Sequence, residues 1–266
     1  MTLRAIEVLK SVDMVAAEDT RMTSRLLEHF AIRQKLLSVH EHNERVAGEK
    51  VLALLRKGQS VALVSDAGTP AVSDPGARLV EMARSEGFRV VPVPGANAAV
   101  AALSASGFMN PHFLFYGFLP SKTAARRTEL ASLKTLPHLL VFYESPHRIM
   151  ETVSDLKDML GEDRTILFGR ELTKLFEQIH LCGLGEALTW LQADPNHQKG
   201  EFVLVVSGHE AVPNQGVSDR AQEILKILLE ELPLKQAVQL AAKISGEKKN
   251  ALYEWALAAK SKSSED

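Results

Sequence analysis

Small residues and carboxylates follow one apolar run of the sequence and could together bind a ligand. The run is Val61–Val64, and the segment Ser65-Asp66-Ala67-Gly68-Thr69-Pro70 comes directly after it, before a helix that we expect to begin at Asp74-Pro75. Ligands of open α/β sheets bind at the carboxyl ends of strands, where small residues let them approach the backbone. An ordinary turn is the alternative, but this composition favours a binding loop. The sequence contains no Walker A motif and no dinucleotide fingerprint, which argues against ATP and NAD.

Similar patterns follow other apolar runs. A second tight turn, Pro94-Gly95, leads into an alanine-rich helix, and charged residues follow further predicted strands in Glu18-Asp19-Thr20-Arg21, Glu144-Ser145-Pro146-His147-Arg148 and Arg170-Glu171-Leu172-Thr173-Lys174. Any one of these segments could be only a solvated loop. Their recurrence at strand carboxyl ends favours a shared cleft. His40-Glu41-His42 could bind a metal, but the sequence shows no third ligand, and we expect a polar strand end and no metal.

The elements that position these residues alternate between strands and helices. Short apolar runs at 14–17, 36–39, 61–64 and 90–93 are separated by amphipathic stretches, and a second series follows Pro111, with strands at 113–118, 139–143, 165–168 and 202–206. This alternation is typical of α/β sheets covered by helices. We therefore expect two α/β domains, residues 1–110 and 111–209, with a cleft between them. A linker at 208–217 then leads to a small all-helical module, residues 218–266, with breaks at Pro233 and Ser245-Gly246.

Charge distinguishes this helical module from the rest of the chain. The whole sequence has 31 Lys and Arg against 33 Asp and Glu, which gives no reason to expect a DNA or membrane partner. Between Leu232 and Lys262, however, six lysines face two glutamates. The spacing is compatible with a helix-turn-helix that binds nucleic acid and equally with a helical bundle that has a solvated lysine face. One cysteine, no signal peptide and no apolar run long enough to span a membrane indicate a cytoplasmic protein.

In their order along the chain, several motifs resemble the tetrapyrrole methylase superfamily. They are Ala17-Glu18-Asp19-Thr20-Arg21, His40-Glu41-His42-Asn43-Glu44, Ser65-Asp66-Ala67-Gly68-Thr69-Pro70, Tyr116-Gly117-Phe118-Leu119-Pro120, Phe142-Tyr143-Glu144-Ser145, Arg170-Glu171-Leu172-Thr173-Lys174 and Lys199-Gly200-Glu201. The resemblance covers almost the whole chain and is strongest to the branch that methylates the ribose 2′-hydroxyl of a decoding-centre cytidine in 16S ribosomal RNA. It implies two α/β domains, S-adenosylmethionine in the cleft between them, and a homodimer.

The resemblance also implies roles for individual residues. The cofactor is expected against Ser65, Asp66, Ala67, Gly68, Thr69, Pro94, Gly95, Phe142, Tyr143, Gly200 and Glu201. Apart from the resemblance, Glu144, Glu171 and Asp66 are candidate proton acceptors because they lie at the ends of predicted strands. The candidate contacts with the RNA of the small ribosomal subunit are Lys122, Arg126, Arg127, Arg148, Arg170, Lys174, Lys235, Lys243, Lys248 and Lys249.

Two alternatives are also compatible with the sequence: a small-molecule methyltransferase of the same superfamily and a non-catalytic RNA-binding protein. The first residues differ from the family pattern. Relatives begin with an additional strand and a glycine-containing loop, whereas this sequence starts with a helical pattern in which Leu3, Ile6 and Leu9 share one face. We therefore expect that strand to be absent.

Overall fold

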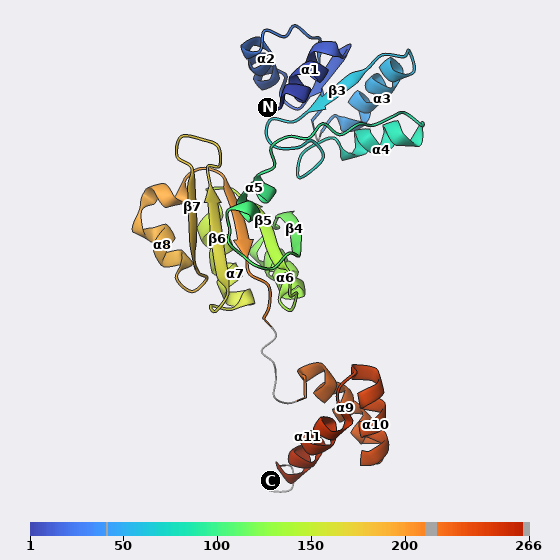
Figure 1. Ribbon diagram of the computed structural model, residues 1–266, viewed down its shortest axis with the longest axis vertical. Coiled ribbons are helices and arrows are strands. Elements are labelled where there is room, and N and C mark those ends of the chain that lie inside the picture. The colour runs from blue at the N-terminus through green and yellow to red at the C-terminus, as the bar shows by residue number, and fades with distance from the viewer. Residues whose placement is uncertain (41, 211–216, 263–266) are drawn as a thin grey trace. The chain divides into compact units, whose positions relative to one another are not determined.

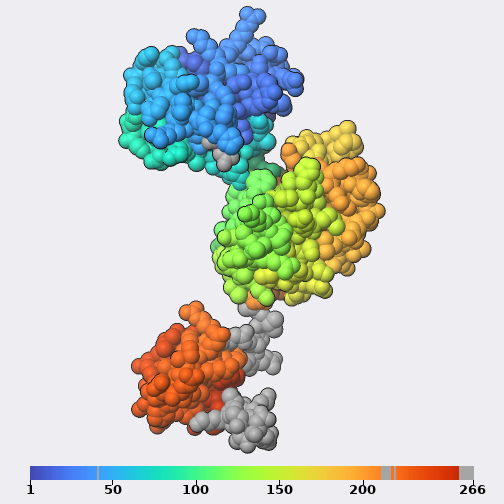
Figure 2. Space-filling view, turned by 180° about the vertical axis from the view of Figure 1, so that it is seen from behind, coloured from blue at the N-terminus to red at the C-terminus, as the bar shows by residue number. Residues whose placement is uncertain are grey.

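The computed structural model describes residues 1–40, 42–210 and 217–262. By its internal contacts the chain divides into two units, Met1–His209 and Glu210–Asp266. Each unit is described by itself (Figures 1 and 2).

The first part of the larger unit is built on a parallel sheet of three strands. Its elements are α1 (Leu3–Ser11), β1 (Met14–Ala17), α2 (Thr20–His29), β2 (Leu36–Ser38), α3 (Glu44–Leu55), β3 (Val61–Val64) and α4 (Ala77–Ser85), and the strand order is β2-β1-β3. The central strand β1 is buried on both faces. Ala16 packs with residues of α3 and α4, whereas Val15 packs with residues of α1 and α2. Helices therefore cover both faces, as the α/β pattern predicted.

The fourth strand that we expected in this sheet does not form. Residues 90–93 have no regular structure, and Val90 and Val91 are exposed. Pro92 and Pro94 have no backbone N–H that could donate a hydrogen bond to a neighbouring strand. Among the described residues β3 pairs with β1 alone, so no strand reaches its other edge. The sequence-based prediction of a strand at 90–93 was therefore wrong.

The second part of the larger unit has a mixed sheet of five strands. Its elements are α5 (Ala98–Ser104), β4 (Phe113–Phe118), α6 (Thr123–Leu133), β5 (Leu139–Glu144), α7 (Ile149–Leu160), β6 (Thr165–Arg170), β7 (Gln178–Gly183), α8 (Ala187–Ala193), a 3-10 turn (Pro195–Gln198) and β8 (Phe202–Val206). The strand order is β4-β5-β8-β6-β7. β4 and β5 are parallel, and the other neighbours are antiparallel.

Helices also cover both faces of this second sheet (Figure 1). Side chains of β5 point alternately to the two faces, as they do in any strand. Leu140 and Phe142 lie in the core with residues of α7 and α8, and Leu139 and Val141 lie in the core with residues of α5. Residues on opposite faces of β5 therefore cannot meet in one site.

The smaller unit consists of α9 (Asp219–Glu231), α10 (Leu234–Ser245) and α11 (Lys249–Lys262). Its core includes Leu225, Val238 and Leu252, one from each helix. The breaks between the helices lie at the predicted positions, Pro233 and Ser245-Gly246. Gly246 has the left-handed conformation typical of a helix C-cap. Most of the predicted linker, residues 211–216, lies outside the described residues. No helix in the described chain combines the length and the apolar character that a membrane span requires.

Candidate functional site at the strand ends

Two acidic segments lie side by side at the carboxyl edge of the first sheet. Ala17 and Val64, the last residues of β1 and β3, are paired in register. The amide of Asp66 donates to the Glu18 carboxylate (3.2 Å), and the amide of Asp19 donates to Asp66 Oδ1 (3.2 Å). The ends of the two strands are thus joined by hydrogen bonds, with two carboxylates between them. Arg21 pairs with Asp19 and holds the pKa of that carboxyl at about 2.

The loop after β3 folds differently from our expectation. Helix α4 begins at Ala77, with Gly76 at its N-cap, so Asp74 does not cap the helix. Glu44 accepts hydrogen bonds from the amides of Gly76, Arg78 and Leu79 instead. Asp74 is therefore available for another role.

The Asp74 carboxyl lies inside the loop. Its Oδ2 is 3.9 Å from the position that a Cβ on Gly68 would take. Burial raises the pKa of Asp74, the nearby charges of Glu18 and Asp66 raise it further, and a hydrogen bond with Ser65 opposes the shift. The structure thus gathers three carboxylates, one half-buried, beside the loop of small residues.

Backbone strain marks this loop and one other. Within the described residues, five non-glycine residues have a positive φ, and four of them lie in two predicted site loops, namely Ala71 and Ser73 after β3 and Glu171 and Thr173 after β6. Such conformations cost about 1–3 kcal/mol each and concentrate at functional sites. The strain supports the assignment of both loops to a site.

The loop after β3 also meets the second sheet. Gly117 on β4 has a φ of +81°, and a Cβ there would lie 2.7 Å from Ser73 Oγ, so only glycine permits this approach. Tyr143 on β5 is close enough to Asp74 for the two groups to interact. Burial raises the pKa of the Tyr143 hydroxyl, a hydrogen bond from the Ala99 backbone lowers it, and the Asp74 charge raises it. The loop after β3 therefore approaches β4 at Gly117 and lies near Tyr143 of β5.

The second predicted turn lies beside the same loop. The Thr69 hydroxyl is 3.5 Å from the carbonyl oxygen of Ala96, and the Thr2 hydroxyl donates to the carbonyl of Pro94 (3.2 Å). Gly95 lies between these two anchored positions. The structure thus brings residues 65–69 and 94–96 together.

Glu144 and Phe142 lie on the other side of β5. Phe142 is fully buried in the core with α7 and α8, so its side chain cannot reach the loop that contains Asp74. The Glu144 carboxylate is also buried and accepts hydrogen bonds from the Ser145 amide (2.8 Å), from Arg148 Nε (3.0 Å) and Nη2 (2.7 Å), and from the Thr152 hydroxyl (2.7 Å). Both of its oxygens are occupied. Glu144 fastens β5 to α7 and is badly placed to accept a substrate proton.

Glu171 is also engaged. Its Oε1 accepts from Lys174 Nζ (2.8 Å) and from the Glu201 amide (2.9 Å). The Lys174 hydrogen bond is the largest cause that lowers the pKa of Glu171. Gly200, with a φ of +90°, lies against this side chain, since a Cβ there would be 2.3 Å from Glu171 Cγ. Gly200, Glu201 and Glu171 thus form one cluster at the end of β6, in which Glu171 is a weakened base.

Three of the predicted RNA-binding arginines are engaged inside the protein. Arg126 is 1% exposed and pairs with Asp155 (2.7 Å). Arg170 is 9% exposed and donates to Gln178 and to the Lys199 carbonyl. Arg148 pairs with Glu144. The burial of Arg126 and Arg170 contradicts a direct phosphate contact, whereas Arg148 is 23% exposed and its guanidinium is held by Glu144.

The other predicted cations are more accessible. Arg127 is half-exposed, although it pairs with Asp155 and Asp158. Lys174 is similarly exposed and pairs with Glu171 and Glu201. The lysines that lie on the surface are Lys122, Lys235, Lys243, Lys248 and Lys249. Four of these five belong to the helical unit.

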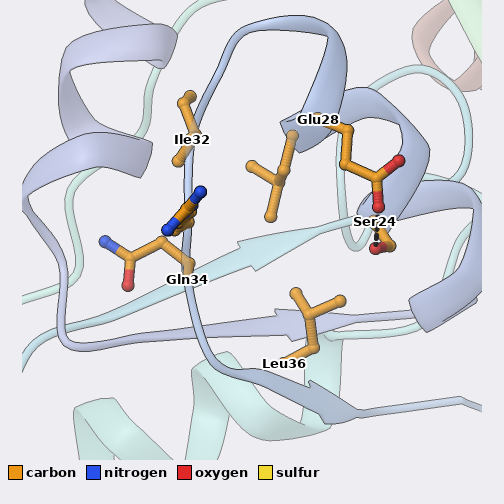
Figure 3. A pocket seen from close by; sticks show the side chains of 7 residues that line it. Ser24, Glu28, Ile32, Gln34 and Leu36 are labelled. Carbon is orange, nitrogen blue, oxygen red and sulfur yellow. Dashed lines mark hydrogen bonds between the residues drawn. The ribbon is translucent and has the colours of Figure 1, made fainter.

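A separate pocket of about 320 Å³ lies between α2 and β2 (Figure 3). Its lining is Ser24, Leu27, Glu28, Ile32, Arg33, Gln34 and Leu36. Because residues 32–34 precede β2, the pocket lies toward the amino ends of the strands, away from the acidic loops. No predicted site residue lines it.

No set of three or more metal-ligating side chains occurs in the part of the chain that the structure describes. The rings of His40 and His42 lie edge to face, with centroids 6.1 Å apart. Glu41, between them, lies outside the described residues.

Asp74 and Glu18 lie at the site, although the sequence pattern assigned neither of them an individual site role. Asp74 was predicted to cap a helix, because Asp before Pro is common at that position. Glu18 was only one charge among many after a strand. Glu18 follows the strand adjacent to β3, and Asp74 lies in the same loop as Asp66; these placements were the signal that could have singled them out.

Two known protein families match this chain. Residues 1–188 match the Tetrapyrrole (Corrin/Porphyrin) Methylases, and residues 215–260 match the RsmI C-terminal HTH domain. The chain is 50% identical over 257 residues to the Ribosomal RNA small subunit methyltransferase I of Escherichia coli O157:H7, covering 97% of this chain and 90% of that protein. Identity to the protein of the same name from Vibrio cholerae is 49%, covering 97% and 89%.

Among solved structures, the methyltransferase CobJ shares the fold, with a TM-score of 0.58 and 19% identity over 78% of this chain and 88% of that one. At this identity the likeness concerns the fold alone. The matches to sequence families and relatives span nearly the whole chain. The chain therefore belongs to the tetrapyrrole methylase family and, within it, to the group of the ribosomal RNA small subunit methyltransferase I proteins.

Proposed function

We propose that this protein transfers a methyl group from S-adenosylmethionine to the ribose 2′-hydroxyl of a decoding-centre cytidine in 16S ribosomal RNA. The observation that carries the proposal is the union, in one chain, of a methylase segment and the helical segment matched at 215–260, at 50% identity to a small-subunit methyltransferase. We expect the enzyme to act as a homodimer on the small ribosomal subunit, in the cytoplasm.

The residues at the strand ends fit this cofactor. S-adenosylmethionine carries a sulfonium and an ammonium group, which suit a site with carboxylates at Glu18, Asp66 and Asp74. The small residues at 67–68 leave the backbone open to a flat nucleoside, and Tyr143, near Asp74, is an aromatic side chain of the same region. When bound, the cofactor supplies an activated methyl group. The chain's own part is alignment of the two reactants, since proximity and orientation can supply much of the rate.

The lysines of the helical unit favour RNA over a small tetrapyrrole as the substrate. Lys235, Lys243, Lys248 and Lys249 are exposed, on α10 and around the start of α11. Exposed lysines neutralise phosphates and release counterions, which makes binding depend on salt.

The direct test incubates the protein with labelled S-adenosylmethionine and small subunits from cells that lack this modification, followed by mapping of ribose methylation. Label at a decoding-centre cytidine supports the proposal. Failure to label any ribosomal RNA, with cofactor binding intact by calorimetry, would reject it.

A second test addresses the helical unit. Four lysines are replaced with glutamine in the test variant, namely Lys235, Lys243, Lys248 and Lys249. The variant should bind small subunits more weakly. The slope of log affinity against log salt concentration should become shallower by up to about 0.9 for each phosphate contact that is lost. Cofactor affinity should not change. The matched control replaces four exposed lysines of the first part of the larger unit in the same way, namely Lys10, Lys35, Lys50 and Lys57. Equal losses in both variants would argue against a specific role of the helical unit.

A further inference from the structure

We propose that the Tyr253 side chain stacks on an unpaired base of ribosomal RNA, beside phosphates that Lys248 and Lys249 bind. This inference rests on the proposed function and deepens it. It names a recognition residue in the helical unit and the single-stranded state of the RNA that this residue selects. The support comes from the exposed face of α11 and from the charges around it.

One face of α11 is exposed on the surface of the helical unit. Lys249 and Tyr253 are four residues apart and follow each other along that face, with Asn250 beside them, and all three residues are exposed. Leu252 and Ala256, by contrast, face the core of the unit and are fully buried. Their burial fixes the rotation of α11 and leaves Tyr253 on the outer side of the helix.

Tyr253 is more exposed than the other tyrosines of the chain. It is 42% exposed, whereas Tyr116 and Tyr143 are partly buried in the larger unit. The other aromatic residue of the helical unit, Trp255, packs against the core, and Lys226 Nζ lies 5.9 Å from the centre of its ring. The core therefore takes up Trp255, and the Tyr253 ring stays available for a flat partner.

Positive charge surrounds this face of α11. The exposed lysines that flank the turn between α10 and α11 are Lys243, Lys248 and Lys249. Within the described residues none of them forms an ion pair. Glu247, the acidic residue of the turn, is half-buried and accepts a hydrogen bond from the Ser218 amide (3.2 Å), whereas Glu254 on α11 is exposed. Three exposed cations against one exposed carboxylate suit a polyanion.

Unpaired RNA accounts for the lysines and the tyrosine together. Proteins that bind single strands combine cationic side chains along the phosphates with aromatic side chains on which the bases stack. In an RNA duplex the bases already stack on one another, and the major groove is too deep and narrow for side chains to read. A duplex or an acidic polypeptide would therefore engage the lysines but would offer no base to Tyr253. The exposed ring favours the single strand.

The first test is Tyr253→Ala in the whole chain, measured by binding to small ribosomal subunits at several salt concentrations. We expect the affinity to fall by about fivefold to 150-fold, the effect of losing one base–aromatic stack. The slope of log affinity against log salt concentration should not change, because no phosphate contact is lost. An affinity within about twofold of the unmodified protein, or a shallower slope, would overturn the proposal.

Two further variants separate stacking from apolar contact. Tyr253→Phe keeps the ring and should bind within about twofold of the unmodified protein, whereas Tyr253→Leu keeps an apolar side chain without a ring and should lose nearly as much as Tyr253→Ala. Thermal unfolding should be the same in all three, because Tyr253 lies outside the core. Equal binding by the Phe and Leu variants would refute stacking.

The matched control is Ile227→Ala, which removes an apolar side chain of α9 that is 64% exposed. It should leave the affinity for small subunits unchanged. A loss as large as that of Tyr253→Ala would show that exposed apolar residues of the helical unit act without distinction, and it would overturn the role of Tyr253.

The closing experiment compares two RNA probes, a single-stranded oligoribonucleotide and the same strand annealed to its complement. Tyr253→Ala should weaken binding of the single strand and leave binding of the duplex unchanged. An equal loss on the duplex, or on polyglutamate as an acidic polypeptide, would overturn the selection of unpaired RNA.

Methylation by the unmodified protein separates this inference from the proposed function. If it labels the ribose and the Tyr253 variants bind like the unmodified protein, only the role of Tyr253 is refuted. If it labels no ribosomal RNA, the proposed function fails, and the two RNA probes alone then decide whether Tyr253 stacks on unpaired bases.

Discussion

Replacement of Glu144 by glutamine should destabilise the larger unit and spare the chemistry. Its carboxylate has no exposed surface and holds Arg148, the Ser145 amide and the Thr152 hydroxyl. Breaking a buried ion pair costs about 3–5 kcal/mol. Because the Arg148 side chain is 23% exposed, water can replace part of the interaction, and we expect about 3 kcal/mol, the low end of that range.

A loss of about 3 kcal/mol should lower the melting temperature of this unit by about 6–12 °C. The transition can be followed by the fluorescence of Trp190, in a Trp255→Phe background, because Trp255 belongs to the helical unit. The control is Glu151→Gln on the same helix, α7. That side chain is 68% exposed and 3.6 Å from its partner, so its loss should cost at most about 1 kcal/mol.

Activity measured well below the transition completes the test. Glu144 points away from Asp74 and Tyr143, so the Glu144→Gln protein should keep its methylation rate to within about tenfold. An unchanged melting temperature together with a rate reduced by more than about a hundredfold would refute this reasoning and restore Glu144 as the base.

Three further outcomes are expected. Arg126→Met should lower the free energy of unfolding in urea by about 3 kcal/mol, whereas Arg127→Met, which removes a partner of Asp155 that is 44% exposed, should cost about 1 kcal/mol or less. Gly200→Ala should lower the free energy of unfolding of the larger unit by about 1–3 kcal/mol, because alanine is strained at this positive φ. The same variant should bind S-adenosylmethionine more weakly in calorimetry. Burial lowers the pKa of His180, so the unfolded chain takes up a proton first as the pH falls below about 6.5. Stability should therefore decrease on acidification, and His180→Gln should reduce that decrease in melting experiments.

Much of the architecture was predictable from local patterns. Apolar runs bounded by turn residues predicted β4 and β8 with their observed bounds, and proline and glycine predicted the breaks between the three terminal helices. These features depend on neighbours in sequence. β7 was missed because Ile179 and Leu181, its apolar residues, follow a charged loop and are partly exposed, so the run lacks the appearance of a buried strand.

The site was less predictable because its geometry depends on long-range contacts. Spacing identified the loop at 65–69, but only the fold reveals that Phe142 and Glu144 point away from it while Tyr143 points toward it. In the same way, Arg126 lies on α6 and Asp155 on α7, with β5 between them in sequence, and no local sequence pattern predicts that they pair. An arginine that binds phosphate and an arginine buried with an aspartate have the same local sequence.

The open edge of β3 has a practical consequence for handling the protein. Within the described residues, that edge has backbone amide and carbonyl groups without a strand partner, and the exposed Val90 and Val91 belong to the same part of the larger unit. Such an edge is a template for strand addition between molecules. The soluble yield of this chain should therefore fall as its concentration rises. A short synthetic peptide with alternating β-branched residues, added during purification, should occupy the edge and suppress the aggregation.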